Sequence, residues 1–245
     1  MCIRDRYCKP YLMFLGSVFM AFNNKIAVIW GDSVAKGVIW NEERGRYTLS
    51  PHAAAAIVSE NTGISVNNRS RMGLTSSEGM ALMKSDIDKG VKGDYAVIEF
   101  GGNDCDFLWK EISDNPNGRH YPRTTAAEYE NNIKEMVKKA REHRMKPVLL
   151  TLPPINSRLY FNFISKGKSP ENILSWLGDT GHIYRYHERY SAIVTKIARE
   201  CHCRLIDIRS AFLDIWDTKD FFCVDGIHPS QKGQEFIGNT ILKAV

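Results

Sequence analysis

A serine, an asparagine and an aspartate–histidine pair each follow an apolar segment of this sequence, which makes them candidates for chemistry. Ser33 comes after the apolar run 26–30, separated from it by a glycine and an aspartate, and Asn103 follows a later run. Asp225 and His228 stand three residues apart before the last helical pattern. A serine hydroxyl is a poor nucleophile at neutral pH until a base removes its proton, and histidine held by a carboxylate is such a base. Together these residue types indicate nucleophilic catalysis at Ser33.

Each of these residues also has a simpler interpretation. A serine directly after a strand often does no more than cap the following helix. Asn103 and Asp104 together are typical of an ordinary turn, and Gly73 is equally at home in a turn. Asp225 and His228 fit a solvated turn before a helix. The interpretation therefore depends on whether the fold brings these residues to one place.

The elements that must position these residues alternate between strands and helices. Five mostly apolar runs predict strands, and they cover residues 26–30, 64–68, 95–100, 147–152 and 203–208. Apolar residues at helical spacing predict helices between them, the clearest covering residues 75–90, 125–140, 183–197 and 231–245. This alternation predicts an α/β fold, a three-layer α/β/α sandwich with a central five-stranded parallel sheet of the flavodoxin-like kind. The carboxyl ends of parallel strands share one edge, so the polar residues that follow them converge there.

Capping signals mark where several helices begin. Thr75 and Thr125 each stand three residues before a glutamate, which predicts two capping boxes. Ser50 followed by Pro51 predicts the start of an alanine-rich helix that ends near residue 61. A further short helix is expected after Ser169 in an otherwise irregular, aromatic segment, residues 155–182.

The polar residues at the strand ends resemble the four sequence blocks of the SGNH (GDSL-type) hydrolase superfamily, in the order that the family has them. They read Gly-Asp-Ser at 31–33, Gly73, Gly-Gly-Asn-Asp at 101–104 and Asp-Gly-Ile-His at 225–228. The resemblance covers about residues 25–245. Val34 stands where the common motif has leucine, which is a conservative change.

The resemblance implies a role for each matching residue. Ser33 would be the nucleophile, His228 the general base and Asp225 the carboxylate that orients the imidazole. The backbone N–H groups of Ser33 and Gly73 and the side-chain amide of Asn103 would form the oxyanion hole. The family mechanism implies neither a cofactor nor a metal.

Substrate choice is expected to depend on the loops around these blocks. Asp32, Trp40, Asp104 and Trp109 are the candidate substrate contacts, although Asp104 fits a role in holding its own loop better than a role in chemistry. We expect residues 155–190 to form a lid-like insertion. His182 and His187 border it and are candidates for lining the pocket, with a purely structural role as the alternative.

The mixture of aromatic and polar residues favours a small-molecule ester with a short acyl group on a hydroxylated carrier, such as an acetylated carbohydrate. A lysophospholipase or long-chain lipase of the same mechanism is the first alternative. The second is a flavodoxin-like module that binds a phosphate or nucleotide at the helix following residue 33 without catalysis. That module gives no reason for Asn103 or for the pair at 225 and 228.

Length and composition are those of one globular domain with no nucleic-acid partner. The chain has 245 residues and a formal net charge of only +5, with no basic run. We expect residues 1–24 to be a leader outside the fold and residues 25–245 to form one domain. The apolar stretch 11–22 is too short to span a bilayer, so no stable membrane insertion is expected. Six cysteines without a metal-ligand pattern predict a cytoplasmic protein; a secreted protein is the alternative if residues 1–24 are a signal segment.

Overall fold

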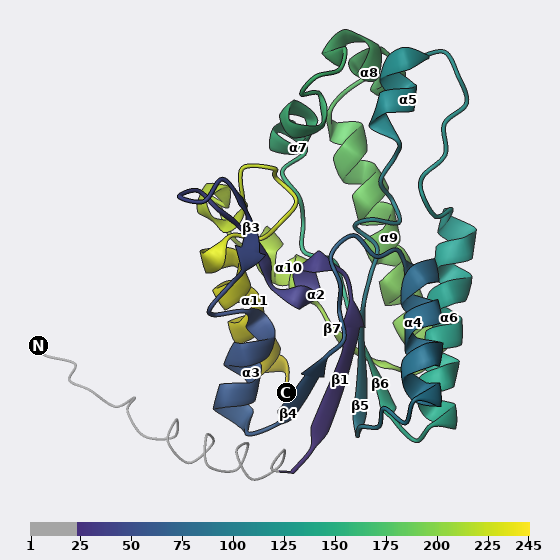
Figure 1. Cartoon of the computed structure of the whole chain (residues 1–245), viewed down its shortest axis with the longest axis vertical. Coiled ribbons are helices and arrows are strands. Elements are labelled where there is room, and N and C mark those ends of the chain that lie inside the picture. The colour runs from purple at the N-terminus through teal and green to yellow at the C-terminus, as the bar shows by residue number, and fades with distance from the viewer. Residues whose placement is uncertain (1–23) are drawn as a thin grey trace, which may run out of the picture.

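The computed structural model describes residues 24–245, so the expected leader lies, but for Asn24, outside the described residues. Five strands form one parallel sheet in the order β4-β1-β5-β6-β7 (Figure 1). Their bounds are β1 Ile26–Gly31, β4 Ser65–Asn68, β5 Tyr95–Glu99, β6 Lys146–Leu150 and β7 Arg204–Ile206. The sheet confirms the predicted fold class and adds the strand order, which the sequence did not reveal.

Helices cover both faces of this sheet, which gives the expected three layers (Figure 1). One face packs against α4 (Ser76–Asp88), α6 (Ala126–Glu142) and α9 (Gly181–Glu200). The other packs against α3 (Ala54–Thr62), α10 (Ile208–Leu213) and α11 (Gln231–Ala244). The three inner strands β1, β5 and β6 are mostly apolar because both of their faces are covered, whereas the edge strand β4 is polar and partly exposed.

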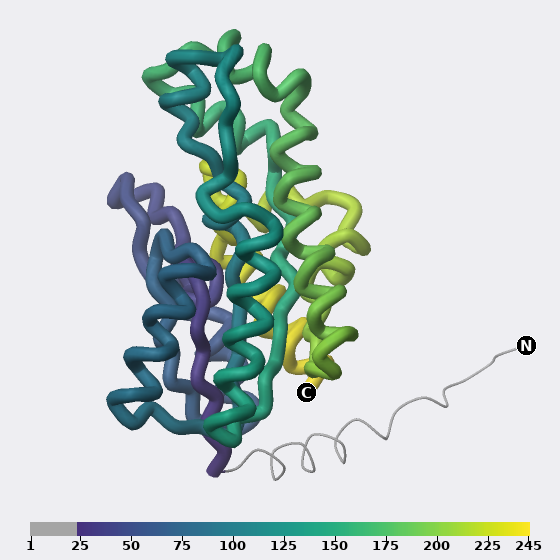
Figure 2. Tube along the Cα trace, turned by 90° about the vertical axis from the view of Figure 1, so that its right-hand side faces the viewer, coloured from purple at the N-terminus to yellow at the C-terminus, as the bar shows by residue number. Residues whose placement is uncertain are grey.

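Two further structures lie beyond the carboxyl edge of the sheet. The first is a hairpin of β2 (Val38–Asn41) and β3 (Arg46–Leu49), which follows the short helix α2 (Ser33–Lys36). The second, which we call the helical cap, consists of α5 (Trp109–Asp114), α7 (Ser157–Ile164), α8 (Pro170–Leu177) and the first half of α9, and it has its own apolar core. Figure 2 shows the helical cap above the sheet. A short 3₁₀ turn, η1 (Lys219–Phe221), precedes the last loop.

The helical cap is more regular than the sequence suggested. Helix α8 begins at the predicted Ser169 cap, but the expectation that the rest of residues 155–182 is irregular was wrong, because α7 lies there. The side chain of Asn156 caps α7 by accepting a hydrogen bond from the N–H of Leu159 (3.1 Å). Tyr160 and Ile164, four residues apart, bury one face of that helix.

The alanine-rich helix begins later than predicted. Ser50 does not cap it: the Ser50 hydroxyl donates a hydrogen bond to Gln231 Oε1 (2.7 Å) and accepts one from the N–H of His52 (3.1 Å), which forms a turn before the helix. Helix α3 therefore starts at Ala54, after a turn. The two predicted capping boxes, at Thr75 and at Thr125, are both formed.

None of the helices within residues 24–245 combines the length and the apolar character that crossing a bilayer requires.

Candidate active site

Ser33 stands at the turn between β1 and α2, at the carboxyl edge of the sheet. The residue that caps α2 is Asp32, whose Oδ1 accepts a hydrogen bond from the N–H of Val34 (2.8 Å). A β-carbon at Gly31 would lie 2.6 Å from the Cβ of Ala35, so only glycine allows this tight turn. Because Asp32 does the capping, the Ser33 hydroxyl is free for another partner, which answers the simpler interpretation of this serine.

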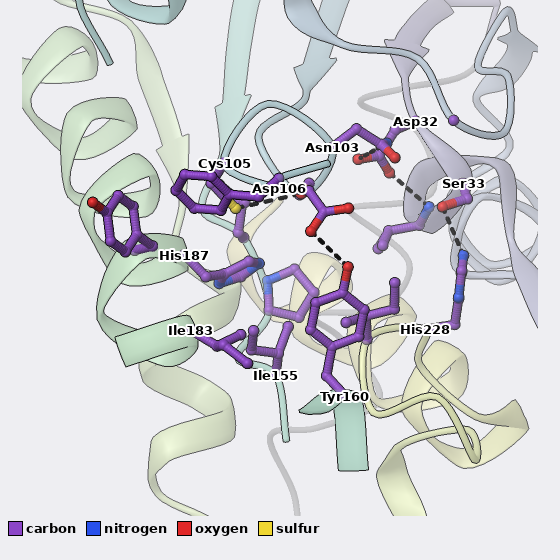
Figure 3. A pocket seen from close by; sticks show the side chains of 18 of the residues that line it. Asp32, Ser33, Asn103, Cys105, Asp106, Ile155, Tyr160, Ile183, His187 and His228 are labelled. Carbon is purple, nitrogen blue, oxygen red and sulfur yellow. Dashed lines mark hydrogen bonds between the residues drawn. The ribbon is translucent and has the colours of Figure 1, made fainter. Parts of the chain in front are cut away.

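That partner is His228, which links Ser33 to Asp225 in a continuous chain of hydrogen bonds. The distance from His228 Nε2 to Ser33 Oγ is 2.9 Å (Figure 3). The distance from His228 Nδ1 to Asp225 Oδ2 is 2.7 Å. The carboxylate can only accept, so Nδ1 carries the hydrogen and Nε2 is left to accept the serine hydroxyl. All three side chains are buried, which excludes the interpretation of residues 225–228 as a solvated turn.

The turn that carries Asp225 and His228 is fixed by its own backbone. Oδ1 of Asp225 accepts hydrogen bonds from the N–H groups of Ile227 and His228, both at 3.0 Å. Burial acts to raise the pKa of Asp225, but the hydrogen bonds from His228 and Tyr47 outweigh it and hold the pKa below its usual value. Asp225 is therefore ionised at neutral pH and available to stabilise a charged imidazole.

Tyr47, on β3 of the hairpin, belongs to the candidate active site, although the sequence analysis did not predict it. Its hydroxyl donates a hydrogen bond to Asp225 Oδ2 (2.5 Å), and its ring centroid lies 4.9 Å from that of His228. Burial and the neighbouring carboxylate both raise the pKa of Tyr47, so the hydroxyl remains a donor. The contact joins residues 178 positions apart. The only sequence signal for the hairpin that carries Tyr47 is the glycine in its loop, Gly45.

Three groups that could donate to an oxyanion line the same cavity as Ser33. Gly73 has a φ of +80°, which favours glycine. Neither its N–H nor that of Ser33 donates to another group in residues 24–245. The Asn103 amide nitrogen donates to the carbonyl oxygen of Leu74 (3.0 Å) and, over a longer distance, to Asp32 Oδ2 (3.3 Å). The structure thus brings together the residues that the four blocks single out.

Asp32 and Glu99 form a buried pair of carboxyl groups beside Ser33. Glu99 ends β5 and is 3% exposed, and its Oε2 has no hydrogen-bond partner in the described chain. Burial raises the pKa of Asp32 to about 6. Burial, then the charge of Asp32, raises the pKa of Glu99 well above its usual value. Of the two carboxyl groups, Glu99 is therefore the one that burial and its neighbour favour more strongly in the protonated form.

The cavity runs from Ser33 and His228 at the sheet edge to the helical cap. It measures about 880 Å³, a volume that includes the open space at its mouth. Figure 3 shows Asp106 and Tyr160 between the catalytic end and His187. Most of the remaining wall is apolar: Val34, Met72, Phe107, Leu152, Pro153, Ile155, Leu177, Ile183 and Ile227.

Of the four residues expected to contact the substrate, two line the cavity and two do not. Asp32 and Trp109 line the cavity, whereas Trp40 and Asp104 do not. The ring of Trp40 packs against Tyr47, with centroids 5.1 Å apart, so it supports the hairpin. Asp104 is fully buried and accepts hydrogen bonds from the N–H and hydroxyl of Ser76, which ties its loop to α4. As substrate contacts these two predictions were wrong.

The two histidines that were candidates for lining the pocket also differ in position. His187 lines the cavity. The Nδ1 of His182 lies 2.8 Å from the carbonyl oxygen of Leu177, and this histidine is not part of the cavity wall. His182 thus has the structural role that was its alternative.

Comparison with known proteins identifies the family of this chain. The model of the GDSL-like lipase/acylhydrolase family matches residues 29–236. A GDSL esterase/lipase, WDL1, from Oryza sativa subsp. japonica is 24% identical over 160 residues, which are 64% of this chain and 55% of that protein.

Among solved structures, a lipase/acylhydrolase from Enterococcus faecalis has a TM-score of 0.61 at 20% identity, covering 89% of this chain and 94% of its own. An acetyl xylan esterase from Geobacillus stearothermophilus has a TM-score of 0.60 at 19% identity, with 91% and 94% covered. These structures share the fold. The chain belongs to the GDSL-like lipase/acylhydrolase family.

Proposed function

We propose that this protein is a serine esterase that cleaves a short acyl group from a hydroxylated carrier through an acyl-enzyme. The observation that carries the proposal is the buried hydrogen-bond chain from Ser33 through His228 to Asp225. A phosphate- or nucleotide-binding module would not need these three hydrogen-bonded side chains. Its ligand would also have to occupy the position that the His228 ring takes beside Ser33.

In the first half of the reaction, Ser33 Oγ attacks the carbonyl carbon of the ester while its proton passes to His228 Nε2. Asp225 stabilises the imidazolium that forms. When the tetrahedral intermediate collapses, the bond to the alcohol oxygen breaks and His228 returns the proton to that oxygen. Water then repeats the sequence on the acyl-enzyme, and this releases the acid and restores Ser33.

The negative charge that develops on the carbonyl oxygen needs donors. The N–H groups of Ser33 and Gly73 have no other described acceptor, and we assign them to this oxygen. The Asn103 amide would exchange its long bond to Asp32 for a bond to the oxyanion, because a fully charged oxygen is the stronger acceptor. One such donor typically contributes about 3–4 kcal/mol to transition-state stabilisation.

The cavity supports a short acyl group on a polar carrier. Carboxyl, phenol, indole and imidazole groups interrupt the apolar wall within reach of one small molecule. Asp106 already accepts hydrogen bonds from Tyr160 and Trp109, but Nε2 of His187 has no acceptor among the described residues, and an alkyl chain would exclude water there without supplying one, which is costly. Two of the solved structures that share the fold are acetyl xylan esterases, and others are lipases or acylhydrolases.

Acyl-length selectivity tests this proposal. We expect p-nitrophenyl acetate and butyrate to be hydrolysed with higher kcat/KM than the decanoate, with Ser33→Ala enzyme as the measure of background hydrolysis. A clear preference for the decanoate would contradict the short-acyl assignment and favour a lipid substrate.

We further propose a reducing, cytoplasmic compartment. The four cysteines of the described residues are free thiols: Cys105, Cys201, Cys203 and Cys223. Burial raises the pKa of Cys105 and of Cys223, which keeps both as unreactive thiols. Expression of residues 1–245 followed by cell fractionation would test this, and recovery from the periplasm or medium would favour the secreted alternative.

A further inference from the structure

We propose that His187 is a specificity-determining residue, whose Nε2–H donates a hydrogen bond to a neutral oxygen atom on the alcohol part of the substrate. Arg209 is the positioning residue that holds the imidazole in the required tautomer. This inference rests on the proposed esterase function and names the chemical group that the far end of the same cavity recognises.

Arg209, at the start of α10, is a buried cation, and the carboxylate of Asp207 lies close enough to interact with its charge without forming an ion pair. It is 7% exposed and forms no ion pair within the described chain. One terminal nitrogen donates to the hydroxyl of Tyr184 (2.9 Å), the other contacts His187 Nδ1 (2.7 Å), and Nε has no partner. Its guanidinium also lies 5.3 Å from the centre of the Tyr184 ring.

The contact with Arg209 determines where His187 carries its hydrogen. A guanidinium has donors and no acceptor, so Nδ1 of His187 must offer its lone pair. The single hydrogen of the neutral ring is then on Nε2. A second proton would set two N–H groups against each other at 2.7 Å and add a charge next to Arg209. Burial and the charge of Arg209 accordingly lower the pKa of His187 well below its usual value.

The donor fixed in this way faces the cavity. His187 is one of the lining residues, and no described group accepts a hydrogen bond from its Nε2. In Figure 3 its ring stands at the far side of the cavity from Ser33, with Asp106 and Tyr160 between them. Once a substrate fills the cavity and excludes water, a donor left there without a partner is costly, so a substrate that brings an acceptor to this place gains affinity over one that does not.

The remaining charges of the cavity favour a neutral acceptor over an anion. The carboxyl groups of Asp32, whose pKa of about 6 leaves it mostly ionised at neutral pH, and of Asp106 line the same cavity and would repel a carboxylate or phosphate. A hydroxyl or ether oxygen meets no such repulsion. Because a short acyl group fills little of the cavity, the larger carrier is the part that extends to His187.

Matched acetate esters test this contact. The substrates are cyclohexylmethyl acetate and its three analogues in which a ring oxygen replaces one CH₂ group, the 2-, 3- and 4-tetrahydropyranylmethyl acetates. We expect the wild-type enzyme to prefer at least one oxygen isomer about three- to tenfold in kcat/KM over the carbocycle, the usual gain from one neutral hydrogen bond.

Two substitutions of His187 separate recognition from folding. In His187→Asn the amide reaches only the position of Nδ1, so it can accept from Arg209 but offers no donor at the position of Nε2. In His187→Gln the amide nitrogen reaches the position of Nε2 and keeps the donor. We expect His187→Asn to lose the preference for the oxygen isomer and His187→Gln to retain most of it. An unchanged preference in His187→Asn, or no preference in the wild-type enzyme, overturns the inference.

Nitrogen NMR of the imidazole, labelled with ¹⁵N and measured on the whole wild-type chain at pH 7, decides the tautomer without any turnover. We expect the His187 resonances of a neutral ring with the hydrogen on Nε2. A hydrogen on Nδ1 or an imidazolium overturns the inference even if the protein is an esterase. Failure to hydrolyse any of the four acetates, with the expected tautomer present, would instead count against the proposed function.

Discussion

The carboxyl edge of the sheet, which carries the candidate active site, and the helical cap form the two ends of one cavity, yet they differ in composition. At the edge, buried carboxyl groups and short turns dominate, with Asp32, Glu99, Asp104 and Asp225 all at most 3% exposed. In the cap the core is aromatic and aliphatic, with Phe107, Trp109 and Trp176 packed edge to face. The buried carboxyl groups at the edge lower the stability of the folded protein, whereas the apolar side chains of the helical cap form part of the cavity wall. We therefore expect changes at the edge to alter the rate of the chemistry and changes in the cap to alter the choice of substrate.

The largest effect is expected at Ser33 and His228. Ser33→Ala removes the nucleophile and His228→Ala removes the base, so each should lower kcat by roughly 10⁵- to 10⁶-fold. The double variant should be no slower than either single one, because the two residues act as a unit. The matched control is Ser77→Ala, which changes an exposed serine of α4 outside the cavity. Steady-state hydrolysis of p-nitrophenyl acetate measures all four, and additive losses would contradict a shared role.

The second-largest effect is expected at Asn103, which lies at the same edge of the sheet as Ser33. Asn103→Ala should lower kcat roughly 10²- to 10³-fold with KM nearly unchanged, since its amide matters most once the carbonyl oxygen is an anion. The variant also loses the bond to Leu74, so thermal unfolding should be recorded beside the kinetics. A wild-type kcat in a folded Asn103→Ala enzyme would remove Asn103 from the oxyanion hole.

A smaller effect is expected at Tyr47, which contacts Asp225 and His228 of the proposed triad from the hairpin. Tyr47→Phe deletes one of the hydrogen bonds that hold the Asp225 carboxylate. We expect kcat to fall about tenfold, the usual order for one bond to a charged group. Tyr121→Phe is the matched control, because Tyr121 is 66% exposed. Equal rates for the two variants would show that the hairpin does not support catalysis.

The smallest effect is expected on thermal stability, and it depends on the protonation of the buried Glu99 carboxyl group. Glu99 has a raised pKa in the folded protein, so its contribution to stability is fully present below pH 4.5 and is lost as the pH rises toward the folded value. Glu99→Gln stays neutral at every pH. It should therefore raise the Tm at pH 8 relative to wild type by about 2–4 °C, with a smaller gain at pH 5. A gain that is larger at pH 5 would contradict the protonated state of Glu99.

The same contrast explains which parts the sequence predicted. Ser33, Asn103, Asp225 and His228 lie within a few residues of a strand end or a helix start, and local turns and caps place them. A parallel sheet then brings them to one edge, whatever the strand order. The fold class and the core of the candidate site were therefore predictable from local patterns.

What depended on distant contacts was not predictable. Tyr47 reaches Asp225 through a hairpin with no strong sequence signal, and Arg209 meets His187 through the packing of α10 against α9. Trp40 was assigned to the pocket from its residue type alone, but its ring packs on Tyr47. Asp104 follows Asn103 directly, yet its side chain turns to Ser76. Neighbouring positions in a loop point in different directions, and residue type does not reveal which.

The most direct test of the account is covalent labelling of Ser33 by a fluorophosphonate, which reacts with a serine only when a neighbouring base activates it. Peptide mass analysis of the wild-type protein should place the phosphonyl group on Ser33 alone. Labelling should be lost in Ser33→Ala and close to absent in His228→Ala, while Ser77→Ala should be labelled like wild type. A wild-type protein that resists the reagent, or that carries it on another residue, would contradict the claim that Ser33 is the nucleophile.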